Sequence, residues 1–360
     1  MIFCLILVAV FFVPTPADAG PVAAAIGALA SWTVAGIAVG QMLVQMAVTF
    51  GLSVLSRALN RKNAPLPPGL RSGQTTSGET TPQTIILGKY ATAGNMVCPP
   101  MTHGRDGRTP NAYLTYVIDL ADMPLHSLDA IWIDDERLIP GNLDGEGFRA
   151  LAGKFAGCAR VKFIDGRQTS ADPYLMDRYA TYPERPWRSD MIGRGVAHAI
   201  VEFKYNREVF KAFPKVLFEV TGIALYDPRK DSSAGGSGAH RWGDPTTWEP
   251  SENSAVQVYN ILRGITLDAT TRWGGRIAGS DLPLDNWRAA MNACDVQVDG
   301  EPQYRTSYEI KVGPESMGGD APADMIDELL RGSCAQIMEY GGIWKTRVGG
   351  VGLPVMVFTD

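Results

Sequence analysis

The sequence predicts a β-rich α+β chain of several domains, preceded by hydrophobic helices at the N-terminal end. Its 39 glycines and 24 prolines favour many short strands joined by turns over a bundle of long helices. Apolar residues make up 45% of the chain and charged residues 20%, which is the balance of a globular protein. A length of 360 residues allows two or three domains, each with its own core.

Residues 1–62 are predicted to form a hydrophobic N-terminal helical segment. No charged residue occurs from Ala19 to Ser56, and the apolar residues, with Trp32 and Gly40 among them, do not alternate at the period of a strand. Three interpretations are open: a cleaved signal peptide followed by a membrane anchor, a helical plug buried by protein, and a stored segment that later enters a membrane. The positive start of a signal peptide is missing, because no Lys or Arg precedes the first apolar run.

Residues 63–83 have the Pro, Gly, Ser and Thr content of a linker and mark the clearest domain boundary. A β-rich domain is expected over residues 84–226, because short β-branched and aromatic runs follow one another with turn signals between them. This spacing favours a sandwich or a barrel-like arrangement. The expected strands are residues 84–90, 113–120, 127–133, 160–164, 197–203 and 215–220, with a helix near 172–182.

Residues 253–360 are predicted to form a small α+β domain. Asn253 or Ser254 can cap a helix that ends before Gly264. Two further helices are expected over residues 285–294 and 323–331, from apolar residues at helical spacing. Gly341-Gly342 between two strand-like runs, residues 335–340 and 343–348, predicts a hairpin with a two-residue turn.

The sequence contains no recognisable constellation for catalysis, and we expect no catalytic, cofactor or metal site. The five cysteines show no CxxC spacing, and the four histidines share no metal-ligand spacing. Asp134-Asp135-Glu136 could be imagined as an acid and a base, but three adjacent acids after a strand are more simply a solvated turn. His198 lies in a strand-like run, where a satisfied, partly buried imidazole is the default. A net charge of −5 gives no support for nucleic-acid binding.

One local motif is more specific than the others. Asp227-Pro228-Arg229 follows a strand, and a Gly- and Ser-rich loop leads from it to Trp248, so residues 227–252 form a predicted crossover between the two domains. Pro228 fixes φ, Asp227 can accept hydrogen bonds from turn N–H groups, and Arg229 offers a planar set of donors. The alternative is an ordinary exposed turn with a mobile loop.

The order of these motifs resembles the N-terminal part of the J-type central hub proteins, which lie at the tail tip of long-tailed phages and of gene transfer agents. The matching features, in chain order, are the strand Thr84-Ile85-Ile86-Leu87-Gly88-Lys89-Tyr90, residues 113–120, the run SLDAIWIDDER (127–137) with Trp132, Asp227-Pro228-Arg229, Trp248, the helix 254–263, and residues 287–296 and 326–348. The resemblance covers about residues 84–360, and its specificity lies in the ordered set rather than in any one motif.

This resemblance implies a non-enzymatic virion protein that closes the tail tube at its far end and takes part in tail assembly, host attachment and DNA ejection. The implied partners are further copies of the chain in a trimer, the distal tail protein, other tail-tip proteins and the tape-measure protein. Contact with the host envelope would come from the N-terminal helices or from a part beyond residue 360, since family members are generally longer. Tails assemble in the host cytoplasm, which argues against a secreted protein. The alternative function is a secreted or membrane-anchored β-rich bacterial protein.

Overall fold

The structure is a computed structural model, and it describes residues 82–183, 185–266, 272–314 and 318–349. All of these belong to one compact unit, Leu70–Asp360, and the other unit, Met1–Gly69, lies outside the described residues. The predicted N-terminal helices, with Ala19, Trp32, Gly40 and Ser56, therefore also lie outside them. No helix in the described ranges is both long enough and apolar enough to cross a membrane.

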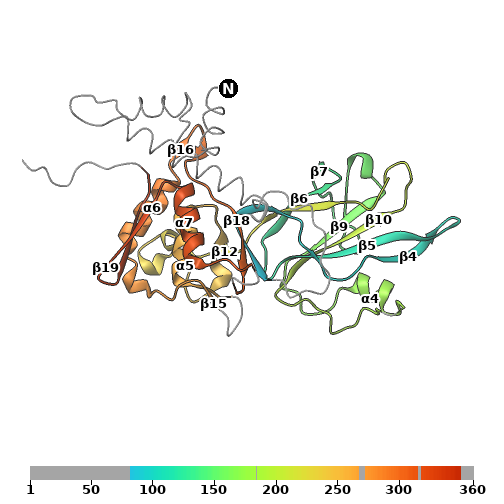
Figure 1. Ribbon diagram of the computed structural model, residues 1–360, viewed down its shortest axis with the longest axis horizontal. Coiled ribbons are helices and arrows are strands. Elements are labelled where there is room, and N and C mark those ends of the chain that lie inside the picture. Colours follow the sequence, from blue (N-terminus) through green and yellow to red (C-terminus); the bar gives the residue numbers. More distant parts are fainter. Residues whose placement is uncertain (1–81, 184, 267–271, 315–317, 350–360) are drawn as a thin grey trace, which may run out of the picture. The chain divides into compact units, whose positions relative to one another are not determined.

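The described part is β-rich and contains two larger sheets (Figure 1). The six-stranded sheet has the order β3-β5-β10-β9-β8, and β4 also pairs with β5. Its strands are β3 (Asn95–Met96), β4 (Met101–Asp106), β5 (Thr109–Ala121), β8 (Arg149–Ala150), β9 (Ala159–Ile164) and β10 (Ala197–Lys204). The four-stranded sheet has the order β2-β11-β6-β7 and consists of β2 (Lys89–Thr92), β6 (Ser127–Ile133), β7 (Glu136–Leu138) and β11 (Val216–Thr221).

Both sheets are open, which corrects the expectation of a barrel-like arrangement. Each sheet ends in strands of only two to four residues, β3 and β8 in one and β2 and β7 in the other, and the two ends of each sheet do not pair. Such short edge strands offer few free N–H and C=O groups for closing a barrel.

The inner faces of the two sheets share one hydrophobic core. Ile118 of β5 and Val201 of β10 belong to the same buried cluster as Ile131 of β6 and Phe218 of β11. Side chains of a strand alternate between its two faces, so these residues identify the face on which the sheets meet. The sandwich expectation agrees with this shared core.

The outer face of the six-stranded sheet is also buried. Helix α4 (Pro173–Tyr179) contributes Leu175 and Tyr179 to a second apolar cluster, which includes Val117 of β5 and Ile200 of β10. The Asp172 carboxylate caps this helix by accepting hydrogen bonds from the N–H groups of residues 174 and 175. Because both faces are covered, β10 is buried from Ala197 to Phe203, with His198 and Glu202 included.

The strand predicted over residues 84–90 is divided in two, β1 (Gln83–Leu87) and β2, at Gly88. Gly88 has φ +66°, and a Cβ there would lie 2.6 Å from Ser307 Oγ and 2.7 Å from a carbonyl oxygen, so only glycine fits without strain. Strand β1 pairs antiparallel with β18 (Tyr308–Val312) rather than with either larger sheet.

The remaining elements are helical and short extended segments. The helices are α5 (Ser254–Arg263), α6 (Leu284–Cys294) and α7 (Pro322–Gly332), close to the three predicted. The predicted hairpin is β19 (Gln336–Tyr340) with β20 (Ile343–Arg347), and Gly341 and Gly342 both have positive φ.

Two-residue strand pairs are β12 (Ala224–Leu225) with β13 (Glu249–Pro250), β14 (Ile265–Thr266) with β15 (Arg272–Trp273), and β16 (Gln297–Val298) with β17 (Glu301–Pro302). The 3-10 helices are η1 (Gly153–Phe155), η2 (Pro228–Lys230), η3 (Ser232–Ala234), η4 (Pro245–Thr247) and η5 (Gly279–Asp281).

Candidate functional site

The predicted Asp-Pro-Arg motif forms a charged turn directly after β12. Pro228 occupies the first position of η2, and Asp227 caps it by accepting a 2.9 Å hydrogen bond from the backbone N–H of Arg229. The Arg229 side chain returns to the same carboxylate, with Nη2 2.7 Å from Oδ2. Asp227 is only 4% exposed, so Arg229 supplies the counter-charge that a buried carboxylate requires.

Arg229 also reaches a distant part of the chain. Its Nη1 atom donates to Oδ2 of Asp295 at 2.7 Å and to Oδ1 of Asn292 at 3.1 Å. Both partners lie at the end of α6, where carbonyl groups and nearby side chains are free to accept hydrogen bonds. Burial by itself lowers the pKa of Arg229, but Asp227 and Asp295 together raise it above its usual range. The guanidinium is therefore permanently charged.

Asn253 extends this contact to α5. Its Oδ1 caps the helix by accepting from the N–H of Val256 at 3.1 Å, while its Nδ2 donates to Oδ1 of Asp295 at 2.9 Å and to the carbonyl of Met291. Asp227, Arg229, Asp295 and Asn253 thus join η2, the end of α6 and the start of α5. We call these four residues the Arg229 clamp.

Trp248 lies in an aromatic cluster on the same stretch of chain. Its ring is 5.5 Å from that of Trp242 and 6.0 Å from that of Tyr226, and its Nε1 donates to the carbonyl of Arg241 at 2.8 Å. The guanidinium of Arg263, from α5, stacks over Trp242 at 3.8 Å. Trp248 therefore lies in a cluster that Arg263 connects to α5, and no hydrogen bond or ring contact found in the described residues joins it to Arg229.

Tyr226 connects the aromatic cluster to a second buried carboxylate. Its hydroxyl donates to Oδ2 of Asp231 at 2.7 Å. Burial raises the pKa of Asp231, but hydrogen bonds from Ser233 and Tyr226 and the charge of Arg241 outweigh it and hold this pKa at about 2. Asp231 therefore stays ionised at any physiological pH.

His240 is buried against the Asp227 backbone. Its Nδ1 accepts a hydrogen bond from the Asp227 N–H at 3.1 Å, and so the neutral ring carries its proton on Nε2. That Nε2 atom is buried and has no hydrogen-bond partner in the structure. Burial, with the charge of Lys230, lowers the pKa of the imidazole below its usual value.

Trp132 lies elsewhere, in the four-stranded sheet. Its Nε1 donates to Oε1 of Glu219 at 2.7 Å, and Arg137 binds the same carboxylate through two nitrogens. Asp134 and Asp135 form the two-residue turn between β6 and β7, both exposed and both with positive φ, which confirms the solvated-turn interpretation. His198 is buried in β10 with its Nδ1 3.2 Å from the Val196 carbonyl, as expected for a satisfied core histidine.

A buried polar network on the outer face of the six-stranded sheet has no counterpart in the sequence predictions. Glu202 of β10 receives a hydrogen bond from the hydroxyl of Tyr174 and an ion pair from Arg160 Nε at 2.7 Å. His103 lies 3.5 Å from the same carboxylate, and its Nδ1 is 2.8 Å from the hydroxyl of Tyr179. Burial is the main reason that the pKa of His103 is lowered. These contacts fix α4 to the sheet.

The polar groups of the Arg229 clamp and of the Glu202 network find their partners mainly within the same cluster. Among the described residues no group of three or more His, Cys, Asp and Glu side chains is placed to hold a metal ion. The partners Asp295 and Asn292 could have been suspected from polar residues at the end of a predicted helix. The Glu202 network gives no local signal, because its members come from separate strands and a helix.

Comparisons with known proteins include a distant likeness in shape to a solved structure. No protein-family model matches the chain, and no curated protein matches it. The solved structure described as the virion of a native gene transfer agent (GTA) particle contains a similar chain, with 14% sequence identity and a TM-score of 0.38. The match covers 88% of this chain and spans 65% of that chain.

Proposed function

We propose that this chain is a structural protein of a virion and forms the central hub of a phage-like tail tip. The observation that carries the proposal is the ordered set of hub motifs in the sequence. These motifs fall in chain order on β1 and β2, on β5, on β6 with β7, on η2 and on α5. Residues 84–226 and 253–360 would be the two hub domains, joined through residues 227–252.

The Arg229 clamp supports a mechanical role. Its charges are paired within the molecule, Arg229 with Asp227 and with Asp295. A joint of this kind needs no ligand, and it fixes the direction in which one segment leaves another. A hub that closes a tail tube has to keep its domains in register while neighbouring proteins assemble on it.

The proposed partners are further copies of this chain in a ring of three, the distal tail protein, other tail-tip proteins and the tape-measure protein. The N-terminal segment would be shielded by protein in the resting particle, because so much exposed apolar surface would drive aggregation. On host contact it would enter the envelope, with Arg57, Arg61 and Lys62 at the headgroups.

The experiment that tests this function locates the chain on intact particles. Antibodies against residues 82–349 would be applied to particles purified from a producing culture and imaged by electron microscopy. Label confined to one end of the tail, together with an intact Met1 by mass spectrometry, is the expected result. Cleavage after Ala19 and label in the cell envelope would instead establish the secreted or anchored alternative.

The expected ring of three has its own measurement. Native mass spectrometry of the tail tip released from particles should give a mass of three chains. A single copy, or a closed ring of another number, would contradict the proposed symmetry while leaving the location on the particle unaffected.

A further inference from the structure

The outer face of the six-stranded sheet carries two polar cross-strand pairs within the β5–β10 ladder. Thr115 lies opposite Glu202 toward one end, and Asp119 lies opposite His198 toward the other. An apolar cross-strand pair, Val117 with Ile200, separates them. The two-residue period of a strand places all of these side chains on the same face.

The first of these pairs has its hydrogen bonds complete. Arg160 and Tyr174 bind the Glu202 carboxylate, and the hydroxyl of Tyr179 donates to Thr115 Oγ1 at 2.7 Å. Helix α4 supplies both tyrosines and covers this end of the ladder. A buried carboxylate is thus tolerated here because a cation and hydroxyl groups surround it.

The second pair is incomplete and borders a cavity of about 630 Å³. Oδ1 of Asp119 is buried and has no hydrogen-bond partner, and none of the ion pairs found in the described residues includes Asp119. His198 does not supply the missing charge, because burial lowers the pKa of its imidazole. Burial, aided by the nearby Asp122, raises the pKa of Asp119 to about 7.

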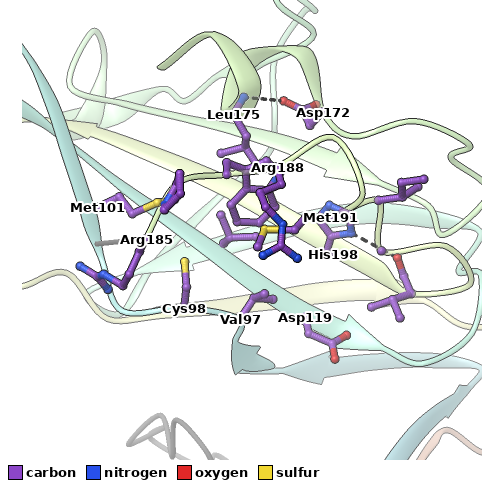
Figure 2. Close-up of a pocket in the computed structure, with 16 residues that line it drawn as sticks. Val97, Cys98, Met101, Asp119, Asp172, Leu175, Arg185, Arg188, Met191 and His198 are labelled. Carbon is purple, nitrogen blue, oxygen red and sulfur yellow. Dashed lines mark hydrogen bonds between the residues drawn. The ribbon is translucent and has the colours of Figure 1, made fainter. Parts of the chain in front are cut away.

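The rest of the cavity wall is mainly apolar (Figure 2). The apolar lining includes Val97, Met101, Val117, Leu175, Trp187 and Met191. Figure 2 shows Met101 from β4, Leu175 from α4, and Met191 from the segment that carries Arg185 and Arg188. Two buried polar atoms of the lining residues have no hydrogen-bond partner, Oδ1 of Asp119 and Nε1 of Trp187, and only the first belongs to a group that can carry charge. An apolar cavity with a few such polar groups is a common form of small-ligand site.

The other charged groups around the cavity already have partners or lie in solvent. Asp172 forms an ion pair with Lys162 at 2.5 Å, and Arg188 one with Asp190 at 2.9 Å. Arg185 is exposed and reaches the carbonyl of Pro99 at 3.4 Å. Water screens an exposed guanidinium, but it does not screen a buried carboxylate oxygen, such as Oδ1 of Asp119, to the same degree. The strongest demand for a counter-charge is therefore at Asp119.

We propose that this cavity binds a ligand with an apolar body and an ammonium or guanidinium head, with the head lying against Asp119. The apolar body would cover the surface between Val117 and Trp187, and the head would supply the donors and the charge that the Glu202 end receives from Arg160 and Tyr174. This inference stands apart from the proposed virion function, since it uses only the geometry of the six-stranded sheet and its outer cover.

Nuclear magnetic resonance of methionine methyl groups in the full chain provides the test. Met101 and Met191 line the cavity, whereas Met338 is 66% exposed on β19 beside a second cavity and reports binding elsewhere in the chain. Three probes of equal length would be titrated: hexylammonium, hexan-1-ol and hexanoate. We expect hexylammonium to shift the Met101 and Met191 signals in a saturable way, to bind about ten-fold or more tightly than hexan-1-ol, and to leave the Met338 signal unchanged.

A pair of matched variants assigns the effect to Asp119. Asp119→Asn should reduce hexylammonium affinity to that of hexan-1-ol, without changing the affinity for hexan-1-ol itself. Asp299→Asn removes the same charge at an exposed position with φ +52°, which asparagine adopts readily, and should change neither affinity.

Three results would overturn the proposal. Tighter binding of hexanoate would show an anion site served by Arg185. An unchanged affinity for hexylammonium in Asp119→Asn would show that the carboxylate takes no part. The third result is that neither the Met101 nor the Met191 signal responds to any probe. If the wild type and the variant melt at the same temperature, this result would show that the cavity is not a binding site.

Discussion

The guanidinium of Arg229 lies 2.7 Å from Oδ2 of Asp295, although the two residues are 66 positions apart in the chain. Arg229 already has a local partner in Asp227, two residues before it, so the contact with Asp295 is additional to the turn. Because Asn253 binds the other oxygen of Asp295, a single carboxylate ties the turn to two helix ends. Each of the four side chains in the clamp therefore has Asp295 or Arg229 as a hydrogen-bond partner.

Loss of the guanidinium should destabilise the protein. We expect Arg229→Ala to lower the free energy of unfolding by about 1–3 kcal/mol, because the buried carboxylate of Asp227 loses its counter-charge. Arg229→Lys should recover only part of this loss, since an ammonium group lacks the planar set of donors. Chemical denaturation of the full chain measures the change.

The control is Arg305→Ala, whose ion pair with Glu301 is exposed and should contribute about 0–1 kcal/mol. Equal effects of the Arg229 and Arg305 variants would show that the clamp is an ordinary surface contact.

Removal of one hydroxyl tests the Glu202 network. Tyr174→Phe deletes the donor to Glu202 while the ring keeps its packing, and we expect a loss of about 1–3 kcal/mol in the free energy of unfolding. Tyr205→Phe is the matched control, because Tyr205 is 50% exposed and its hydroxyl accepts only from its neighbour Arg207. The control should change stability by less than about 0.5 kcal/mol. The interpretation fails if the two variants melt alike.

His240 should make the protein less stable in mild acid. Its folded pKa lies below the ordinary value of about 6.5, so the unfolded chain takes up a proton first and stability is lost as the pH falls below that value. Protonation of Nδ1 would also break the hydrogen bond from Asp227. We expect His240→Gln to make the unfolding free energy less dependent on pH between about 5 and 7. His126→Gln, at an exposed position, should leave that dependence unchanged. The pKa values of His103 and His198 are lowered as well, so these two residues would supply the rest of the pH dependence.

Asp119 should have the opposite pH profile. Its folded pKa of about 7 lies above its ordinary value, so the folded chain holds a proton that the unfolded chain releases, and stability falls as the pH rises from about 4 to about 7. Asp119→Asn should therefore stabilise the protein on the order of 1–3 kcal/mol more at pH 8 than at pH 4. Denaturation at the two pH values measures this difference. A variant whose stability relative to wild type is the same at both would contradict a raised pKa.

A charge in the N-terminal segment tests its proposed entry into the host envelope. We expect particles carrying Ala35→Asp to assemble and adsorb but to fail in DNA delivery, since a carboxylate at the centre of a membrane helix costs about 2.5–3.5 kcal/mol. Ser77→Asp, in the polar linker, is the control and should infect normally. Failure at assembly would indicate a packed plug instead, and normal infection by both variants would exclude either role.

Elements with local signals could be predicted from the sequence. Helix α5 begins after Asn253 and ends before Gly264, because the capping side chain and the glycine act within a few residues of the helix ends. The β19–β20 hairpin follows from Gly341-Gly342, whose positive φ angles suit a two-residue turn. The charged turn at residues 227–229 belongs to the same group, since Asp227 caps the turn that Pro228 begins and binds the side chain of Arg229 two residues on.

Contacts between distant segments were decided only by the tertiary structure. Strand β1 pairs with β18, and Thr92 donates a hydrogen bond to Glu309, 217 positions away. The partner Asp295, the surroundings of Glu202 and the cavity beside Asp119 likewise arise from elements that are far apart in the chain. A capping or turn motif needs only its neighbours, so its residues specify it. A long-range pair forms only where burial of complementary apolar faces outweighs the entropy cost of closing the chain between them. No short stretch of sequence determines that free-energy difference.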